Sequence, residues 1–169
     1  MMPTSTTYWT TVDSPVGELL LSGDGDGLAG LWFPSGSRAR RPAPGWRRDG
    51  AAFAAVAEQL DEYWAHERTA FDLPLRMHGT EFERAVWQKL REIPYGETTS
   101  YGELALSLGL TGHGARAVGR ANGHNPIAII VPCHRVIGAD GSLTGFGGGL
   151  ERKRLLLELE SPPAQLSFG

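Results

Sequence analysis

The sequence predicts an α+β fold in which a small antiparallel sheet with one covering helix precedes a helical domain. Three short runs of β-forming residues, at 8–12, 17–22 and 27–33, are separated by turns rich in Gly, Pro and Asp. This pattern is typical of antiparallel hairpins. After residue 79 the pattern changes to helix-start signals followed by apolar residues at helical spacing.

The first domain is expected to span residues 1–75. An amphipathic helix over 51–66 has its apolar residues on one face, and that face is expected to cover the sheet. The face contains Phe53, Val56, Ala57, Leu60, Tyr63 and Trp64. Five arginines between residues 38 and 48 are interpreted as part of a solvated loop. No catalytic motif is recognised in this domain, and a linker at 76–79 joins it to the second domain, residues 80–169.

Helix-start signals organise the second domain. Thr80 with Glu83, and Ser100 with Glu103, have the spacing of capping boxes. A further helix is expected over residues 115–122, followed directly by a glycine that can end it. Two short helices joined by a Gly-containing turn indicate a helix-turn-helix.

The residues after the helix-turn-helix predict a wing. Residues 136–143 have the pattern of a β-hairpin with Asp140-Gly141 at its turn. The glycine-rich stretch 145–149 that follows can approach a ligand closely because it lacks side chains. Residues 150–160 predict a final helix.

The helix expected over residues 115–122 is built mostly from small side chains. Ala117, Gly119 and Ala121 allow another backbone to approach closely, and Arg116 is a long side chain near its start. Two interpretations stay open from these residues alone. The helix either fits a nucleic acid by shape or packs tightly against neighbouring helices.

Cys133 is the only cysteine in the chain, and a histidine follows it directly. The preceding apolar run, residues 127–131, predicts a buried strand that ends at Pro132. A thiol is a weak nucleophile until it is deprotonated, and a nearby imidazole or cation usually promotes that step. A small buried hydrophobic residue is the competing interpretation of Cys133.

Charge and composition limit the functions that the chain can have. The net charge is −3, but no acidic residue lies between Glu103 and Asp140, where three arginines and three histidines occur. This window suits a phosphate-bearing partner. One cysteine allows neither an internal disulfide nor a Cys-rich metal site, so no metal is expected. No run of apolar residues is long enough to span a membrane and no signal pattern is present, so we expect a cytoplasmic protein.

Three motifs together resemble those of the O6-alkylguanine-DNA alkyltransferases. They are Arg116-Ala117-Val118-Gly119, then Asn125-Pro126, then Pro132-Cys133-His134-Arg135-Val136. The resemblance is close over residues 79–160, where Ile93-Pro94-Tyr95-Gly96-Glu97-Thr98 and Glu160 also match. It implies an RNase H-like first domain followed by a winged helix-turn-helix domain.

The resemblance implies direct-reversal DNA repair. Such a protein binds double-stranded DNA through the minor groove as a monomer and flips O6-alkylguanine out of the duplex, with O4-alkylthymine as a second candidate substrate. It then transfers the alkyl group irreversibly to Cys133, once per molecule and without a cofactor. The enzyme class implied is methylated-DNA–protein-cysteine methyltransferase.

The resemblance also assigns roles residue by residue. Cys133 is the nucleophile, His134 takes the thiol proton through a water, and Glu160 orients the imidazole. Asn125 joins the DNA-reading helix to the cysteine segment, and Tyr101 helps to rotate the nucleotide and to protonate the departing guanine. The residues implied at the DNA are Arg116, which fills the vacated space, with Ala117, Gly119, Arg120, Ala121 and Tyr101.

Five residues are implied in the pocket for the alkylated base: Ala128, Val136, Phe146, Gly147 and Gly148. The family often has tyrosine where this chain has Phe146 and serine where it has Gly147. The smaller Gly147 leaves more room, so we expect tolerance of larger alkyl groups.

Three other functions compete with this interpretation. A non-catalytic lesion-binding protein of the alkyltransferase-like type would replace the cysteine, and Cys133 argues against it. A winged-helix regulator would carry long polar side chains on its recognition helix, where this chain has alanines and a glycine. A hydrolase could also use a Cys-His pair.

Overall fold

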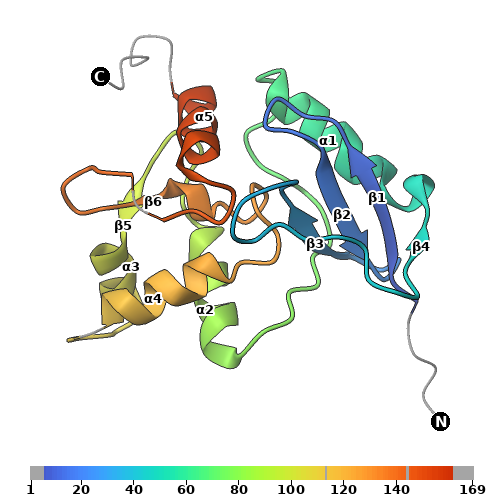
Figure 1. Ribbon diagram of the computed structural model, residues 1–169. Helices are drawn as coiled ribbons and strands as arrows, with labels where there is room; N and C mark the ends of the chain where they lie inside the picture. The colour runs from blue at the N-terminus through green and yellow to red at the C-terminus, as the bar shows by residue number, and fades with distance from the viewer. Residues whose placement is uncertain (1–5, 113, 144, 162–169) are drawn as a thin grey trace.

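The computed structural model describes residues 6–112, 114–143 and 145–161. The first half forms a sheet with a helix against one face, and the second half forms a group of helices beside it (Figure 1). This is the α+β arrangement that the sequence predicts.

The three predicted strands are present as β1 (Tyr8–Val12), β2 (Leu19–Gly23) and β3 (Leu28–Trp32), each antiparallel to the next. A short fourth strand, β4 (Arg47–Arg48), pairs parallel to β1, so the sheet order is β3-β2-β1-β4. The sequence did not predict β4, because two arginines in a Gly- and Pro-rich stretch carry no strand pattern.

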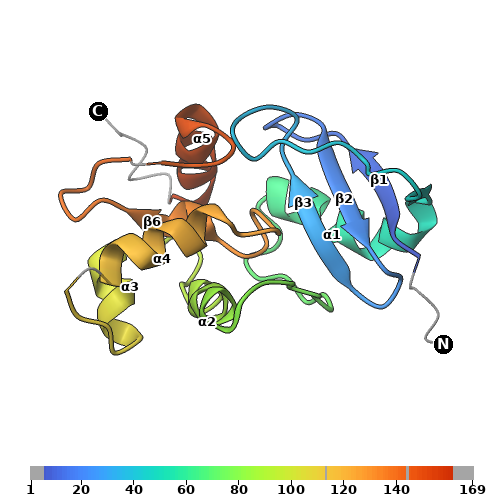
Figure 2. The ribbon, with the colours of Figure 1, turned by 60° about the horizontal axis from the view of Figure 1, so that its bottom comes forward.

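The covering helix α1 (Ala54–Trp64) lies against the sheet (Figure 2). Its first turn is a 3₁₀ helix, Gly50–Phe53, which Asp49 caps by accepting a hydrogen bond from the backbone of Ala51. The predicted helix is therefore confirmed, with a tighter first turn. The predicted apolar face is mainly buried and includes Phe53, Val56, Leu60 and Tyr63.

The second domain contains α2 (Glu81–Leu90), α3 (Tyr101–Ser107), α4 (Gly114–Gly123) and α5 (Leu150–Glu160). The capping box of Thr80 and Glu83 at the start of α2 is confirmed. At α3 only half of the second box forms, because the carboxylate of Glu103 accepts a hydrogen bond from Thr99. Helices α3 and α4 form the predicted helix-turn-helix (Figure 2).

The prediction of a strand over residues 127–131 is wrong, although the segment is buried as expected. It forms compact turns in which Val131 N–H donates to the carbonyl of Ile127 at 3.0 Å and Ile129 has a φ of 71°. The side chain of Asn125 stabilises these turns by accepting from Ile127 N–H and donating to the Val131 carbonyl. An apolar run cannot by itself distinguish this compact segment from a strand.

The prediction of a β-hairpin wing over residues 136–143 is also wrong. Only β6 (Val136–Ile137) is extended, and it pairs in parallel with β5 (Thr99–Ser100). The Asp140 carboxylate accepts hydrogen bonds from the backbone and hydroxyl of Ser142, which closes a local turn. Within the described residues the wing is therefore a loop.

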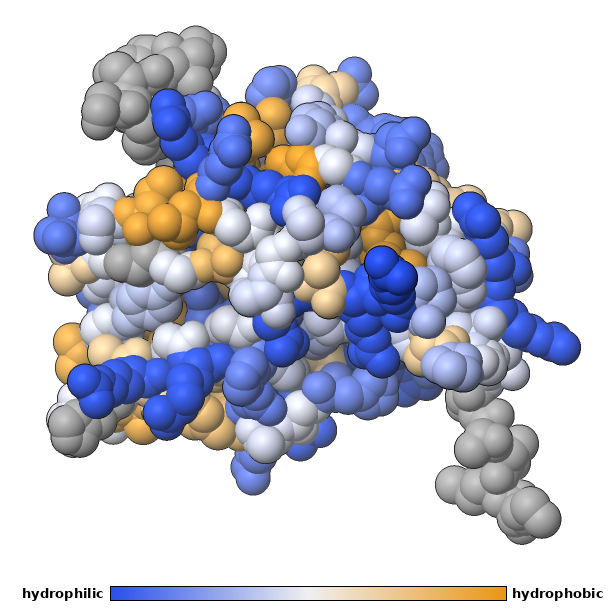
Figure 3. Space-filling view, viewed as in Figure 1, coloured by the Kyte–Doolittle hydropathy of each residue, from blue (hydrophilic) through white to orange (hydrophobic). Residues whose placement is uncertain are grey.

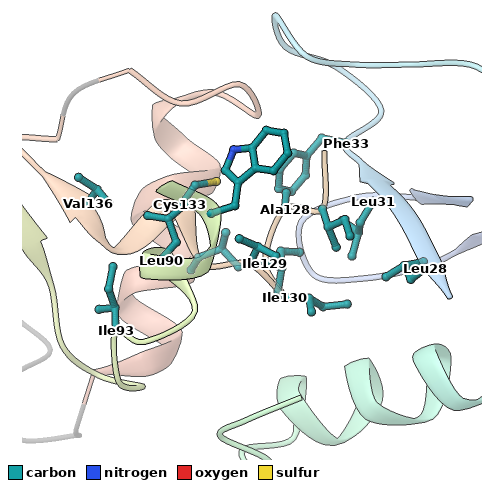
Figure 4. Close-up of a cluster of buried hydrophobic side chains, with 14 of the residues drawn as sticks. Leu28, Leu31, Phe33, Leu90, Ile93, Ala128, Ile129, Ile130, Cys133 and Val136 are labelled. Atoms are coloured by element: carbon teal, nitrogen blue, oxygen red, sulfur yellow. The ribbon is translucent and has the colours of Figure 1, made fainter. Parts of the chain in front are cut away.

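The two domains share one hydrophobic core. Leu31 at the sheet edge donates its N–H to the carbonyl of Pro126 at 2.9 Å, which docks the 127–131 segment against β3. Leu28, Leu31 and Phe33 lie on the sheet side of this core and Ala128, Ile129 and Ile130 beside them, and Cys133 belongs to the same cluster (Figure 4). None of the described helices is both long and apolar enough to cross a bilayer. On the face shown in Figure 3, hydrophobic side chains form small patches among hydrophilic ones.

Candidate active site

Cys133 begins a short 3₁₀ turn, Cys133–Arg135, and only 6% of its surface is exposed. The turn follows the compact 127–131 segment, so the thiol is held by the core. Burial raises the pKa of the thiol above its ordinary value, and interactions with Asn125 and the positive charges of Lys153 and Arg38 partly oppose that rise. The resting thiol is therefore protonated, and it needs a base to become a nucleophile.

His134, the next residue in the chain, is the candidate base. Its Nε2 lies 2.8 Å from Glu160 Oε2, and neither side chain is exposed by more than 1%. Nδ1 is buried and has no hydrogen-bond partner among the described residues. Burial lowers the pKa of His134 more than Glu160 raises it, so the imidazole is neutral at pH 7. With Nε2–H donated to the carboxylate, Nδ1 is left as the proton acceptor.

Glu160 is held as a carboxylate. Burial alone would raise its pKa, but hydrogen bonds and charge from His134 and Arg135 outweigh burial and hold the pKa at about 2. Arg135 donates from Nε to Oε1 at 2.8 Å and from Nη2 to Oε2 at 2.9 Å. Tyr63 of α1 also donates its hydroxyl to Oε2. This carboxylate can therefore orient His134 and stabilise its protonated form.

Asn125 and Asn122 connect the cysteine segment to α4. Asn125 lies just after the helix and is buried, with both side-chain polar atoms bonded to the backbone of the 127–131 segment. Asn122, in the last turn of α4, donates its Nδ2 to the Cys133 carbonyl at 3.4 Å. The position of α4 and the position of the thiol are therefore fixed relative to each other.

Helix α4 has an open face and a packed face. Arg116, Gly119 and Arg120 line an open hollow of about 710 Å³ together with Tyr101 of α3. On the opposite side Ala121 is only 2% exposed, and its carbonyl accepts a hydrogen bond from Trp87 Nε1. Ala117 is half-buried and does not line the hollow. The side chain of Ala121 is thus unavailable for DNA, and the packing interpretation holds for this side of the helix.

The cavity at Cys133 has a volume of only about 30 Å³, comparable to one water molecule. Of the residues implied there, Ala128, Phe146, Gly147 and Gly148 line it. Val136 does not, because it is fully buried in the core.

Arg38 occupies the space that Gly147 leaves. A Cβ atom on Gly147 would collide with the aliphatic part of Arg38, whose Nη2 donates to the His124 carbonyl at 3.3 Å. Arg38 lines both the cavity at Cys133 and the open hollow beside α4. The extra room that the sequence suggested for larger alkyl groups is therefore filled in this structure.

Comparisons with known proteins agree with this geometry. Residues 7–77 match the ribonuclease-like domain of 6-O-methylguanine DNA methyltransferase, and residues 81–162 match its DNA-binding domain. The methylated-DNA–protein-cysteine methyltransferase of Mycobacterium tuberculosis is 52% identical over 169 residues, covering 95% of this chain and 98% of the relative. This chain belongs to the O6-methylguanine-DNA methyltransferase family.

Other members of the family support the assignment. The methylated-DNA–protein-cysteine methyltransferase of Methanosarcina acetivorans is 48% identical over 153 residues, covering 90% of this chain and 97% of the relative. The crystal structure of Mycobacterium tuberculosis OGT in complex with DNA matches with a TM-score of 0.86 and 51% identity, over 96% of this chain and 99% of that chain. The predicted family, fold class and enzyme class are confirmed.

Four residues near Cys133, His134 or Glu160 could not be assigned to the site from the sequence: Arg38, Tyr63, Arg135 and Lys153. Lys153 is fully buried, and burial lowers its pKa to about 8 while Cys133 acts in the opposite direction. Helical spacing carried a signal for it, since Lys153, Leu156 and Glu160 fall on one face of α5. No such signal exists for Arg38 or Tyr63, because only the tertiary fold brings the first domain to the site. The described residues contain no cluster of acidic, His or Cys side chains suited to a metal ion.

Proposed function

We propose that this protein repairs O6-alkylguanine in double-stranded DNA by moving the alkyl group to Sγ of Cys133, once per molecule. The observation that supports the proposal most strongly is the buried thiol beside a neutral His134 whose Nε2 is bonded to Glu160. O4-alkylthymine is a second candidate substrate, because it presents the same alkyl–oxygen bond.

The chemistry balances without a cofactor. His134 Nδ1 accepts the Cys133 proton through a water, and Glu160 stabilises the imidazolium that forms. The thiolate attacks the alkyl carbon, so that an S–C bond forms as the C–O6 bond breaks. Protonation of the departing guanine completes the step, and Tyr101 in the open hollow beside α4 is the proposed proton donor. None of the described residues that line the Cys133 cavity carries a group suited to cleaving the thioether product, so we expect each molecule to act once.

Burial of the thiol requires base flipping. A base stacked in a duplex cannot reach a sulfur inside a narrow cavity, so the target nucleotide leaves the stack. The cavity of about 30 Å³ is too small for a purine. Arg38 therefore moves aside as the base enters, since its side chain lines both the Cys133 cavity and the open hollow beside α4.

Helix α4 is the proposed DNA-reading element, and the minor groove is its proposed site. That groove is about 6 Å wide, narrower than a helix of about 10 Å with its side chains. Small residues on the exposed face, Gly119 above all, permit close approach to the groove. Arg116 on the same face fills the space that the flipped base leaves, and the protein acts as a monomer.

Peptide mapping by mass spectrometry tests this function. The protein is incubated with a duplex that contains one O6-methylguanine, digested and analysed for the modified peptide. One methyl group on Cys133 is expected, and none in the Cys133→Ser variant incubated in parallel. Folded wild-type protein that leaves Cys133 unmodified would overturn the proposal and would favour a non-catalytic lesion-binding protein.

A further inference from the structure

We propose that Tyr63, from α1 of the first domain, is a positioning residue for catalysis that acts on His134 through Glu160. This inference rests on the proposed function and adds a residue to it. The Tyr63 hydroxyl donates to Glu160 Oε2 at 2.5 Å, and His134 Nε2 lies 2.8 Å from the same oxygen. The first domain thus contributes directly to the orientation of the catalytic base.

The hydroxyl of Tyr63 has a role separate from the packing of its ring. The ring contacts Trp64, Phe71 and Tyr95, with centroids 5.0, 5.4 and 6.2 Å away. A phenylalanine would make the same ring contacts. Tyr63 is fully buried, and its hydroxyl donates a hydrogen bond to Glu160.

Tyr63 stays a donor under all working conditions. Burial and the negative charge of Glu160 raise the pKa of its phenol well above the ordinary value of 10.0. The O–H group is therefore a permanent dipole that points at the carboxylate. Glu160 in turn accepts from Tyr63, His134 and Arg135, which come from both domains.

Sharing one oxygen between Tyr63 and His134 has two physical effects. The phenol restricts the rotation of the carboxylate, so the imidazole is held in the orientation that leaves Nδ1 free for the thiol proton. It also takes up part of the negative charge on Oε2, which weakens the pull of Glu160 on the imidazolium. Loss of the hydroxyl would therefore disorder the base and make His134 easier to protonate in the resting protein.

The test compares Tyr63→Phe with Tyr95→Phe. Tyr95 is the matched control, since its hydroxyl belongs to the same cluster but donates to the backbone carbonyl of Leu159 at 3.3 Å. Single-turnover rates of methyl transfer are measured at pH values on both sides of 6.5, the ordinary pKa of histidine. A folded fraction from circular dichroism normalises each rate.

Tyr63→Phe is expected to lower the plateau rate about tenfold, the value of one hydrogen bond to a charged group. The acid limb of its pH–rate profile is expected to move to higher pH by up to about one unit. Tyr95→Phe should leave both unchanged. In a Glu160→Gln background the Tyr63→Phe change should have no further effect on the profile, because the acceptor that couples it to His134 is altered.

An NMR titration of His134 in the free protein gives a second readout that needs neither DNA nor activity. Its pKa should rise in Tyr63→Phe and stay constant in Tyr95→Phe. Unchanged rate profiles and an unchanged titration in Tyr63→Phe would overturn the inference and leave only a packing role. Absence of methyl transfer in wild-type protein would instead overturn the proposed function, so the two failures are distinguishable.

Discussion

Arg135 and Glu160 form a two-pronged ion pair inside the protein, with Nε–Oε1 and Nη2–Oε2 distances of 2.8 and 2.9 Å. The remaining Arg135 nitrogen, Nη1, donates to the Ile93 carbonyl at 2.6 Å. A buried carboxylate of this kind is stable only while its charge is compensated. The pair therefore stabilises the fold and holds the carboxylate that contacts His134, the proposed base.

Glu160→Gln is expected to damage activity and stability together. It removes the charge that stabilises protonated His134, so the single-turnover rate should fall by at least about a hundredfold. It also leaves the buried guanidinium of Arg135 without its counter-charge, at a cost of about 3 kcal/mol in the free energy of unfolding. Stopped-flow methyl transfer and urea denaturation measure the two effects.

The effect of Glu160→Gln on the free energy of unfolding should depend on pH. The pKa of Glu160 is about 2 in the folded protein and 4.5 ordinarily, so its contribution to stability is complete above pH 4.5 and is lost as the pH falls towards 2. The difference in unfolding free energy between wild type and Glu160→Gln should therefore shrink over that range. A difference that stays constant with pH would show that the ionised carboxylate is not the stabilising group.

The sequence predicted the first three strands and the helices, but not the backbone conformation of residues 127–131 and 136–143. Hydrophobic periodicity located α1, and the Thr80 capping box located α2. The Ile127–Val131 run was misread as a strand because its burial, which the sequence encodes, is compatible with several backbone conformations. The prediction of a wing hairpin was wrong because β6 pairs with β5, which is distant in the sequence, and not with the residues that follow it.

Contacts between the domains were the hardest to predict. Tyr63 reaches Glu160 across 97 residues of chain, and Arg38 reaches His124 across 86. In the sequence Tyr63 is one apolar residue on a helix face and Arg38 is one arginine in a loop. Only the docking of the first domain onto the 127–131 segment places Arg38 beside the Cys133 cavity and Tyr63 against Glu160.

Gly119→Leu should separate folding from DNA binding. The position is on the open face of α4, where an added Cβ meets only the Tyr101 ring at an ordinary distance of 3.8 Å. The melting temperature should stay the same or rise, because leucine is favoured over glycine within a helix by up to about 1 kcal/mol. The bulk should nevertheless weaken binding to duplex DNA at least about tenfold, measured by fluorescence anisotropy. Unchanged affinity would place the DNA on another face.

Arg116→Ala tests whether Arg116 assists the flipping of the target base out of the duplex. If Arg116 fills the vacated space in the duplex, its loss should slow repair of a double-stranded lesion about tenfold and a single-stranded lesion much less, since a single strand has little stacking to break. Arg120→Ala is the control, because loss of a phosphate contact should weaken binding to both substrates. Equal slowing of both substrates by Arg116→Ala would contradict its role in flipping.

Arg38→Ala should change the preference for alkyl size. The substitution opens the space that Arg38 takes beside Gly147, so the ratio of benzyl to methyl transfer rates should rise several-fold. Arg40→Ala is the matched control, since Arg40 stacks over Trp32 and Trp46 and does not line the cavity. Competing single-turnover rates on the two lesions give the ratio, and an unchanged ratio would show that Arg38 does not restrict the cavity.

The stoichiometry of methyl transfer tests the central claim most directly. Purified protein is mixed with an excess of duplex DNA that carries O6-methylguanine, and the methyl groups lost from the DNA are counted against the protein molecules present. The account predicts a single burst that stops at one methyl group per protein, all of it on Cys133. Continued repair beyond that ratio, or transfer to another residue, would contradict it.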